Sequence, residues 1–272
     1  MEKTMIDLHC HLLPGVDDGA PDLATALAMA RIAADDGIRI VACTPHIYPG
    51  MYDNNGPAIR RAVIELQPRL EEAGIPLRLT LGADTHIASD LVASLRAGRA
   101  PTLHDSRYFL LEPPHHVAPP RLAETVFDLL AAGYVPVITH PERLSWIEDR
   151  YETFVDLACQ GAWLQVTAGS LIGRFGKAAQ YWGERLLDEG WVHILATDSH
   201  GVERRPPLLA EGRRAAERWL GVEEAHHLVV TRPQGVLDNV EPERLSPPPA
   251  LHVNAHASRL GGSWLQRLFR RS

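Results

Sequence analysis

The 272-residue chain alternates short apolar runs with longer alanine- and leucine-rich stretches. Seven apolar runs are predicted as strands: Met5–His11, Ile38–Cys43, Leu77–Gly82, Tyr108–Glu112, Val135–His140, Trp163–Thr167 and Val192–Thr197. Helices are predicted at Pro21–Gly37, Pro57–Ala73, Ala88–Ala97, Pro119–Ala132, Arg150–Gly161, Lys177–Gly190 and Pro207–Leu220, where apolar residues recur at helical spacing. Repeated strand–helix units are typical of a parallel sheet with helices outside. Such a sheet is either open and doubly wound or closed into a barrel.

Polar side chains gather where the predicted strands end. They are His9, His11, His46, Asp84, Glu112, His140, Asp198 and His200. In a closed barrel all strand C-termini open on one face, which is where barrel enzymes place their sites. Residues spread over the whole chain would then converge. This pattern favours a distorted (β/α) barrel of about seven units, with one site at its C-terminal face.

Composition narrows the class of protein further. The net charge of −7 argues against general nucleic-acid binding. The three cysteines, Cys10, Cys43 and Cys159, form no CxxC pair, so a zinc ribbon or a redox dithiol is not expected. No run approaches the roughly 18 apolar residues of a membrane span, and the N-terminus has no signal-peptide pattern. We expect a cytoplasmic protein.

The composition changes after about Val240, which divides the chain into a folded domain, 1–240, and a tail, 241–272. The tail begins as a proline-containing linker and ends in "SWLQRLFRRS". In that end Trp264, Leu265, Leu268 and Phe269 share one helical face beside arginines. Three interpretations stay open: a short helix docking on its own or a neighbouring subunit of a homo-oligomer, a weak contact with an anionic membrane surface, or disorder.

The first predicted strand carries three polar side chains that could take part in metal binding. Asp7, His9 and His11 alternate along it and are expected on one face. Two imidazoles on one face can bind a single cation, and Asp7 could orient one of them. The candidate ligands now number nine: His9, His11, Asp18, His46, Asp84, Glu112, His140, Asp198 and His200. Imidazole and carboxylate ligands without thiolate suit Mn²⁺, Fe²⁺ or Zn²⁺. So many ligands indicate two or three ions, which is hydrolytic chemistry on a phosphoryl group.

Arginines beside this set fit an anionic substrate. Arg143 follows His140 by three residues, and a guanidinium presents a fork to phosphate at every working pH. Arg205 has a neighbour, Arg204, that could be the binder instead. Tyr52 and Asn54 either touch a substrate ring or form a simple turn.

Three further histidines are interpreted as loop residues. His86 follows Asp84 by two residues and is expected in a loop rather than as an extra ligand. His115 and His116 form a tempting pair, but adjacent residues rarely face one ion, so both are also expected in a loop.

Longer motifs carry a resemblance. "MIDLHCHLLPGVDDGA", "GMYDNN", "DSRYFLLE", "PVITHPERL", "QVTAGSLIGRFGKAAQ" and "VHILATDSHGVERRPP" resemble the PHP superfamily of metal-dependent phosphoesterases. Within it, the chain resembles the bacterial tyrosine-protein phosphatases of capsule and exopolysaccharide loci, the CpsB/YwqE type. The similar stretches span about Met5 to Leu237.

The resemblance implies a PHP-type barrel with a trinuclear site, most readily manganese, held by the nine residues named above. Glu112 would be the bridging carboxylate, Arg143 and Arg205 would hold the substrate phosphate, and either His46 or a water would supply a proton. Asp84 departs from the family pattern, which has glutamate there. The implied substrate is the phosphotyrosine-containing tail of a bacterial tyrosine autokinase. The alternatives are a small-molecule phosphatase, such as one acting on histidinol phosphate, and a non-enzymatic regulator.

Overall fold

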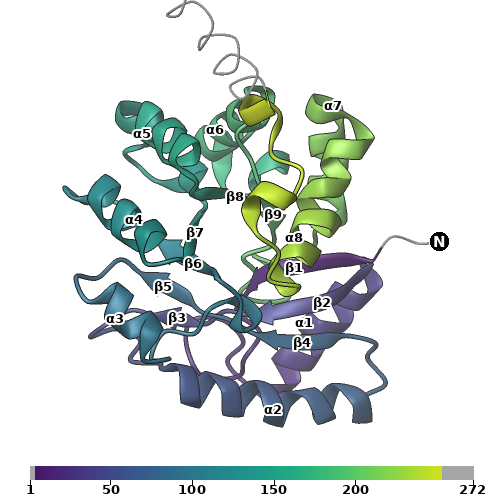
Figure 1. Cartoon of the computed structure of the whole chain (residues 1–272). Coiled ribbons are helices and arrows are strands. Elements are labelled where there is room, and N and C mark those ends of the chain that lie inside the picture. Colours follow the sequence, from purple (N-terminus) through teal and green to yellow (C-terminus); the bar gives the residue numbers. More distant parts are fainter. Residues whose placement is uncertain (1–3, 253–272) are drawn as a thin grey trace, which may run out of the picture.

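The computed structural model describes residues 4–252. Its strands are β1 Met5–Cys10, β2 Ile38–Cys43, β3 His46–Ile47, β4 Arg78–Leu81, β5 Asp84–His86, β6 Tyr108–Glu112, β7 Val135–Thr139, β8 Trp163–Thr167 and β9 Ile194–Ala196. Its α-helices are α1 Leu23–Asp35, α2 Gly56–Glu72, α3 Leu91–Arg96, α4 Leu122–Ala131, α5 Ile147–Gln160, α6 Gly176–Asp188, α7 Ala210–His226 and α8 Arg232–Leu237. Strands form a ring and most helices lie outside it (Figure 1).

The strands form two parallel sheets that together close a barrel. One sheet has the order β1-β2-β4 and the other β3-β5-β6-β7-β8-β9. The short strand β3 continues the path of β2, and β5 continues that of β4. The nine strands therefore occupy seven positions around the barrel. Closure comes from β1 beside the end of β9, where Asp198 N–H donates to His9 O at 2.8 Å and His11 N–H donates to Ser199 O at 2.9 Å. The predicted seven-unit barrel is confirmed.

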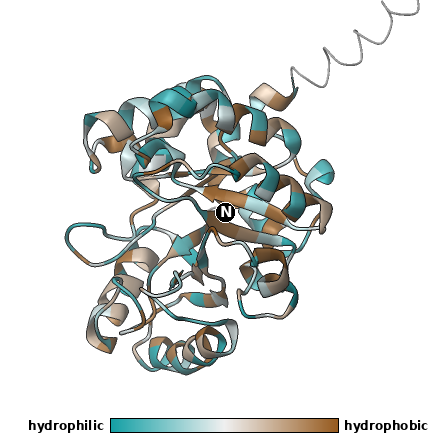
Figure 2. Ribbon diagram, turned by 90° about the vertical axis from the view of Figure 1, so that its left-hand side faces the viewer, coloured by the Kyte–Doolittle hydropathy of each residue, from teal (hydrophilic) through white to brown (hydrophobic). Residues whose placement is uncertain are grey.

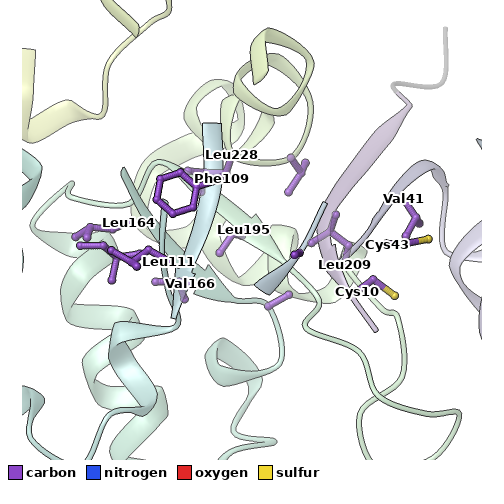
Figure 3. Packing of buried hydrophobic residues seen from close by; sticks show 14 of the residues in the cluster. Cys10, Val41, Cys43, Phe109, Leu111, Leu164, Val166, Leu195, Leu209 and Leu228 are labelled. Carbon is purple, nitrogen blue, oxygen red and sulfur yellow. The ribbon is translucent and has the colours of Figure 1, made fainter. Parts of the chain in front are cut away.

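Apolar side chains fill both faces of the strands. The interior cluster includes Leu8, Tyr108 and Trp163, each at most 4% exposed. A larger cluster, which includes Phe109 and Leu164, packs between the strands and the helices outside (Figure 3). Brown, apolar stretches accordingly mark the central strands, whereas the helices mix brown and teal (Figure 2). At the C-terminal ends of the strands the interior side chains become polar, and this change positions the site.

The opposite end of the barrel is covered by the chain after α7. A π-helical segment, His227–Thr231, continues α7 directly into α8. Tyr108 Oη donates to Val240 O at 2.8 Å, and Ala250 N–H donates to Gly190 O at 3.1 Å. The first part of the region assigned to a tail, 241–252, therefore packs on the barrel. The "SWLQRLFRRS" end lies outside the described residues.

Differences from the predicted elements are local. The short strands β3 and β5 and the helix α8 were not predicted. The last predicted helix ended at Leu220, where Gly221 indeed adopts φ 80°, but helical structure resumes at once and runs through His226. Within residues 4–252, none of the helices has the length and apolar character needed to cross a membrane.

Candidate metal centre

All nine predicted ligands converge at the C-terminal face of the barrel. Six of them are at most 5% exposed: His9, His11, Asp84, Glu112, His140 and Asp198. The His46 and His200 side chains are 14% and 7% exposed, whereas Asp18 is 48% exposed and lies at the mouth. Residues up to 191 positions apart thus form one polar cluster, as the arrangement of parallel strands predicted.

Two imidazoles of β1 and the loop after it point their Nε2 atoms at each other. His9 Nε2 and His11 Nε2 are 3.2 Å apart. His9 Nδ1 donates to Gln165 Oε1 at 2.8 Å, and His11 Nδ1 donates to Asp17 Oδ2 at 2.7 Å. When both rings are neutral, these two bonds place the proton on Nδ1, so that each Nε2 carries a lone pair. Two lone pairs at this separation fit a shared cation.

Asp7 does not orient a histidine ring, so that prediction is wrong. The pairing of β1 with β2 shifts register between Asp7 and Cys10, which breaks the strict alternation assumed from the sequence. Asp7 instead accepts from Thr197 N–H at 3.0 Å and from Thr197 Oγ1 at 2.5 Å, and so fastens β1 to β9. Burial raises the pKa of Asp7 to about 6, although these hydrogen bonds oppose the rise.

Asp17 is a site residue that sequence reasoning missed. Besides His11, it accepts from His46 N–H at 3.0 Å and from Gly19 N–H at 2.9 Å. Gly19 lies so close to the first strand that a Cβ there would sit 2.2 Å from His11 O. The loop that carries Asp17 and Asp18 is thereby pressed against the site. The signal was present in the adjacent aspartates before a glycine, of which only Asp18 was chosen.

Asp18 joins two imidazoles at the outer side of the site. Its Oδ1 is 3.4 Å from His46 Nε2 and 3.3 Å from His200 Nε2. His11, Asp18, His46 and His200 each offer an atom to one group whose members lie within 4.8 Å of one another. This group has the size of a binding site for one ion.

Asp84 connects the inner and outer parts of the site despite its short side chain. Its Oδ2 is 3.3 Å from His9 Nε2 and 3.6 Å from His46 Nδ1. It belongs to two further groups of the same compactness, one with His9 and His11 and one with His46 and Glu112. A fourth group contains Glu112, His115 and His140.

Unpartnered polar atoms show that a cation fits these groups. Among the described residues, the following site atoms are buried without a hydrogen-bond partner: His46 Nδ1, Asp84 Oδ1 and Oδ2, His86 Nδ1, His140 Nδ1 and His200 Nε2. A buried polar atom that makes no hydrogen bond costs about 1–3 kcal/mol. Metal ions would satisfy such atoms, so the residues present suit a polynuclear centre.

The electrostatics of the cavity also favour positive charge. Burial alone would lower the pKa of His9, but Asp198 and Asp84 raise it to about 9. Burial would also lower the pKa of His46, but Glu112 and Asp84 outweigh burial and raise this pKa to about 10. Without added cations, the carboxylates thus draw protons onto imidazoles, and divalent ions would replace that positive charge.

Two site residues hold strained backbone conformations. His140 and Asp198 have φ values of 37° and 48°, in the left-handed region that residues other than glycine rarely adopt. His140 directly follows β7, and Asp198 is the second residue after β9. Such strain is typical of functional positions, where the surrounding structure holds it.

Both predicted phosphate-binding arginines lie at the edge of the cluster. The Arg143 guanidinium pairs with Asp198 Oδ2, and Arg205 Nη2 is 2.6 Å from the same oxygen. The Phe175 ring packs beneath both, with centroids 4.3 Å and 5.6 Å from the two Cζ atoms. Burial would raise the pKa of Asp198, but Arg205, His9 and Arg143 hold it well below its usual range. Arg204 is exposed to solvent.

Aromatic side chains border the outer histidines. Tyr52 stacks on His46 at 5.5 Å between ring centroids, and Tyr48 stacks on His86 at 3.9 Å. Asn54 Nδ2 donates to Val16 O and to His46 O, so it ties loops together. His86 lies in strand β5 rather than in a loop, with its Nδ1 3.7 Å from Glu112 Oε2.

The fold and these residues define a class: a closed parallel barrel with clustered imidazole and carboxylate ligands at its C-terminal face and arginines beside them. The chain belongs to the family described as "Capsular polysaccharide synthesis, CpsB/CapC", whose sequence profile matches residues 5–238.

Named relatives agree with this assignment. The tyrosine-protein phosphatase YwqE of Bacillus subtilis is 40% identical over 221 residues, which cover 80% of this chain and 86% of YwqE. A crystal structure from the pair YwqE of Bacillus subtilis and CpsB of Streptococcus pneumoniae, described as unique metal-dependent tyrosine phosphatases, has a TM-score of 0.84 at 36% identity. That match covers 90% of this chain and 98% of the other. The histidinol phosphate phosphatase of Lactococcus lactis, at 16% identity and a TM-score of 0.52 over 82% of this chain and 94% of that one, shares the fold alone.

Proposed function

We propose that this chain is a metal-dependent tyrosine-protein phosphatase, a phosphoric monoester hydrolase that does not use a cysteine nucleophile. The observation that carries the proposal is the set of compact ligand groups with buried unpartnered atoms, next to two arginines, in a member of the CpsB/CapC family. The 40% identity to a tyrosine-protein phosphatase supports the choice of phosphotyrosine as substrate.

The ligands proposed for two or three divalent ions are His9, His11, Asp18, His46, Asp84, Glu112, His140, Asp198 and His200. Imidazoles and carboxylates without thiolate suit Mn²⁺, Fe²⁺ or Zn²⁺. Of these we propose Mn²⁺, as the resemblance implies. When bound, such ions lower the pKa of water and stabilise the negative charge of a reacting phosphoryl group.

The protein's own groups would bind and orient the substrate. Arg143 and Arg205 are cationic at every working pH and stand together on one side of the cavity. They are proposed to hold the phosphoryl oxygens and to stabilise the charge that spreads over them during transfer. Gln165 and Asp17 hold His9 and His11 in the tautomer that directs Nε2 into the cavity. His46 touches three carboxylates, Asp18, Asp84 and Glu112, which favours a ligand role over proton donation.

The partner proposed is the phosphotyrosine-containing tail of a bacterial tyrosine kinase that controls capsule or exopolysaccharide synthesis. The family description and the relatives' names support this choice. Because such a tail lies in the cytoplasm, we propose the same compartment for this chain.

Three substrates test the function. We expect a phosphotyrosyl peptide to give a kcat/KM at least 100-fold above that of histidinol phosphate and of a matched phosphoseryl peptide. The phenol leaving group, with a pKa near 10, departs more readily than an alkyl alcohol. A higher kcat/KM for histidinol phosphate would overturn the proposal in favour of the small-molecule phosphatase. No turnover of any of the three at full metal content would favour the non-enzymatic regulator.

A further inference from the structure

His115 faces the metal centre although its neighbour does not. Its Nε2 is 3.8 Å from Glu112 Oε1, and its ring lies over that of His140 with 4.9 Å between centroids and 28° between planes. The His115 side chain is 34% exposed, whereas His116 is exposed to solvent with its ring centroid 6.3 Å away. The prediction that both residues lie in a loop is confirmed, and within that loop His115 is the one that approaches the candidate ligands.

Backbone contacts fix the loop that presents His115. Its carbonyl oxygen accepts from Ser145 N–H and from Ser145 Oγ, both at 3.0 Å. The preceding carbonyl, Pro114 O, accepts from Trp146 Nε1 at 2.9 Å. These bonds tie the loop after β6 to the loop after β7, which carries His140 and Arg143. The His115 ring is thus held at the mouth before any ligand arrives, as a preorganised binding group must be.

Glu112 and His140 form a compact group of three possible ligands with His115. Of the nine ligands proposed above, only these two belong to the group that includes His115. His140 is 2% exposed, and its Nδ1 has no hydrogen-bond partner among the described residues. A divalent ion held by two side chains alone would bind weakly, because hydrolytic sites of this kind use three protein ligands and leave one position open.

We propose that His115 is a metal ligand which, with Glu112 and His140, completes a two-histidine, one-glutamate position for one of the divalent ions. This inference rests on the proposed metal-dependent function and adds a ligand to it. Such an ion would supply positive charge near Arg143, which lies three residues after His140.

Metal binding itself tests the inference. Purified wild-type protein, His115→Ala, His115→Gln and the control His116→Ala are loaded with Mn²⁺, gel-filtered and analysed for metal. Dissociation is then followed by competition with a chromophoric chelator. We expect both His115 variants to lose close to one ion per chain, or to release one ion at least tenfold more readily, with His116→Ala unchanged. The rise in Tm on adding Mn²⁺ should also be smaller in the His115 variants, because tighter binding to the folded state stabilises it more.

Each other outcome decides the question. Wild-type metal content and release in both His115 variants would overturn the inference, whether or not activity falls. Equal metal loss in His116→Ala would also overturn it, because the effect would then belong to the loop. The proposed function fails separately: a wild-type protein that binds no Mn²⁺, or that keeps full activity without metal, refutes the metal-dependent phosphatase itself. Circular dichroism before loading shows whether the variants are folded, and His115→Gln preserves side-chain bulk for that purpose.

Discussion

Arg143 and Arg205 reach the same carboxylate oxygen, Oδ2 of Asp198, from loops that are 62 positions apart in the sequence. The other oxygen, Oδ1, faces the imidazoles of His9 and His11 at 3.3 and 3.4 Å. Asp198 therefore stands between the candidate metal ligands and the arginines. A phosphoryl group that bridged ions and guanidinium groups would occupy the space beside this residue.

The first prediction concerns these arginines. Replacing Arg143 or Arg205 by alanine should lower kcat/KM on a phosphotyrosyl peptide by ten- to 150-fold. Each replacement removes a charge-assisted hydrogen bond to the substrate phosphate, which is worth about 1.5–3 kcal/mol. Arg→Lys should recover part of the loss, since an ammonium group lacks the bidentate fork. The matched control is the exposed Arg204→Ala, and kcat and KM are measured for all variants. If Arg204→Ala lost activity while Arg205→Ala kept it, the phosphate contact would belong to Arg204 and not to Arg205.

A second prediction concerns the nucleophile. Cys10 and Cys43 are buried, and burial raises the pKa of each thiol further, so both stay protonated and unreactive. Cys159 lies on α5, away from the cluster. The triple replacement of Cys10, Cys43 and Cys159 by serine should retain most of the activity per bound metal. A loss of about 1,000-fold with metal content intact would point to a cysteine phosphatase instead.

Ligand position should determine how much metal a variant loses. Glu112 contacts both His46 and His140 and belongs to two ligand groups, whereas Asp18 belongs to one and is half exposed. We expect Glu112→Gln to lose at least one ion per chain and nearly all turnover. Asp18→Asn should keep more metal and respond to added Mn²⁺. Elemental analysis and kinetics compare the two variants. Equal losses of metal and turnover in both would show that Glu112 is not a bridging ligand.

His193 makes stability depend on pH at the opposite end of the barrel. It is 3% exposed, and its Nδ1 accepts from Leu164 N–H at 3.1 Å. Burial and then Arg232 lower its pKa well below the usual 6.5. The unfolded chain therefore binds a proton that the folded chain does not, and stability falls as the pH drops below about 6.5.

The variant His193→Gln isolates this effect. Glutamine can accept the Leu164 hydrogen bond but does not titrate. Between pH 6.5 and 5 the free energy of unfolding should fall less steeply in the variant, by up to about 1.4 kcal/mol per pH unit, the worth of one proton. Urea unfolding at each pH of metal-free protein measures the slopes. Identical slopes would show that His193 titrates alike in both states.

Much of this arrangement could be predicted from the chain alone. The seven main strands follow from apolar runs, and polar residues at the ends of parallel strands must meet. The features that the sequence did not predict depend on tertiary packing. The two-residue β3 and three-residue β5 are too short to show a period, and beside the bulge in β1 the Asp7 carboxylate bonds to Thr197 rather than to a histidine ring.

The supporting residues were harder to predict than the ligands. Gln165 lies in a buried strand like any other, and only the distance to His9 Nδ1 identifies it. His115 was expected only to lie in a loop, and the bonds from Ser145 and Trp146 show how that loop is held. Such contacts join loops from different repeats, so no local pattern in the sequence records them.

The central claim is that divalent metal ions bound at this face of the barrel are required for phosphotyrosine hydrolysis. The most direct test is to strip one preparation with a chelator, return Mn²⁺ in steps, and measure bound metal and phosphotyrosyl-peptide turnover on the same samples. We predict that turnover vanishes in the stripped protein and returns in proportion to bound Mn²⁺, up to two or three ions per chain. Full turnover by protein shown to be metal-free would contradict the account.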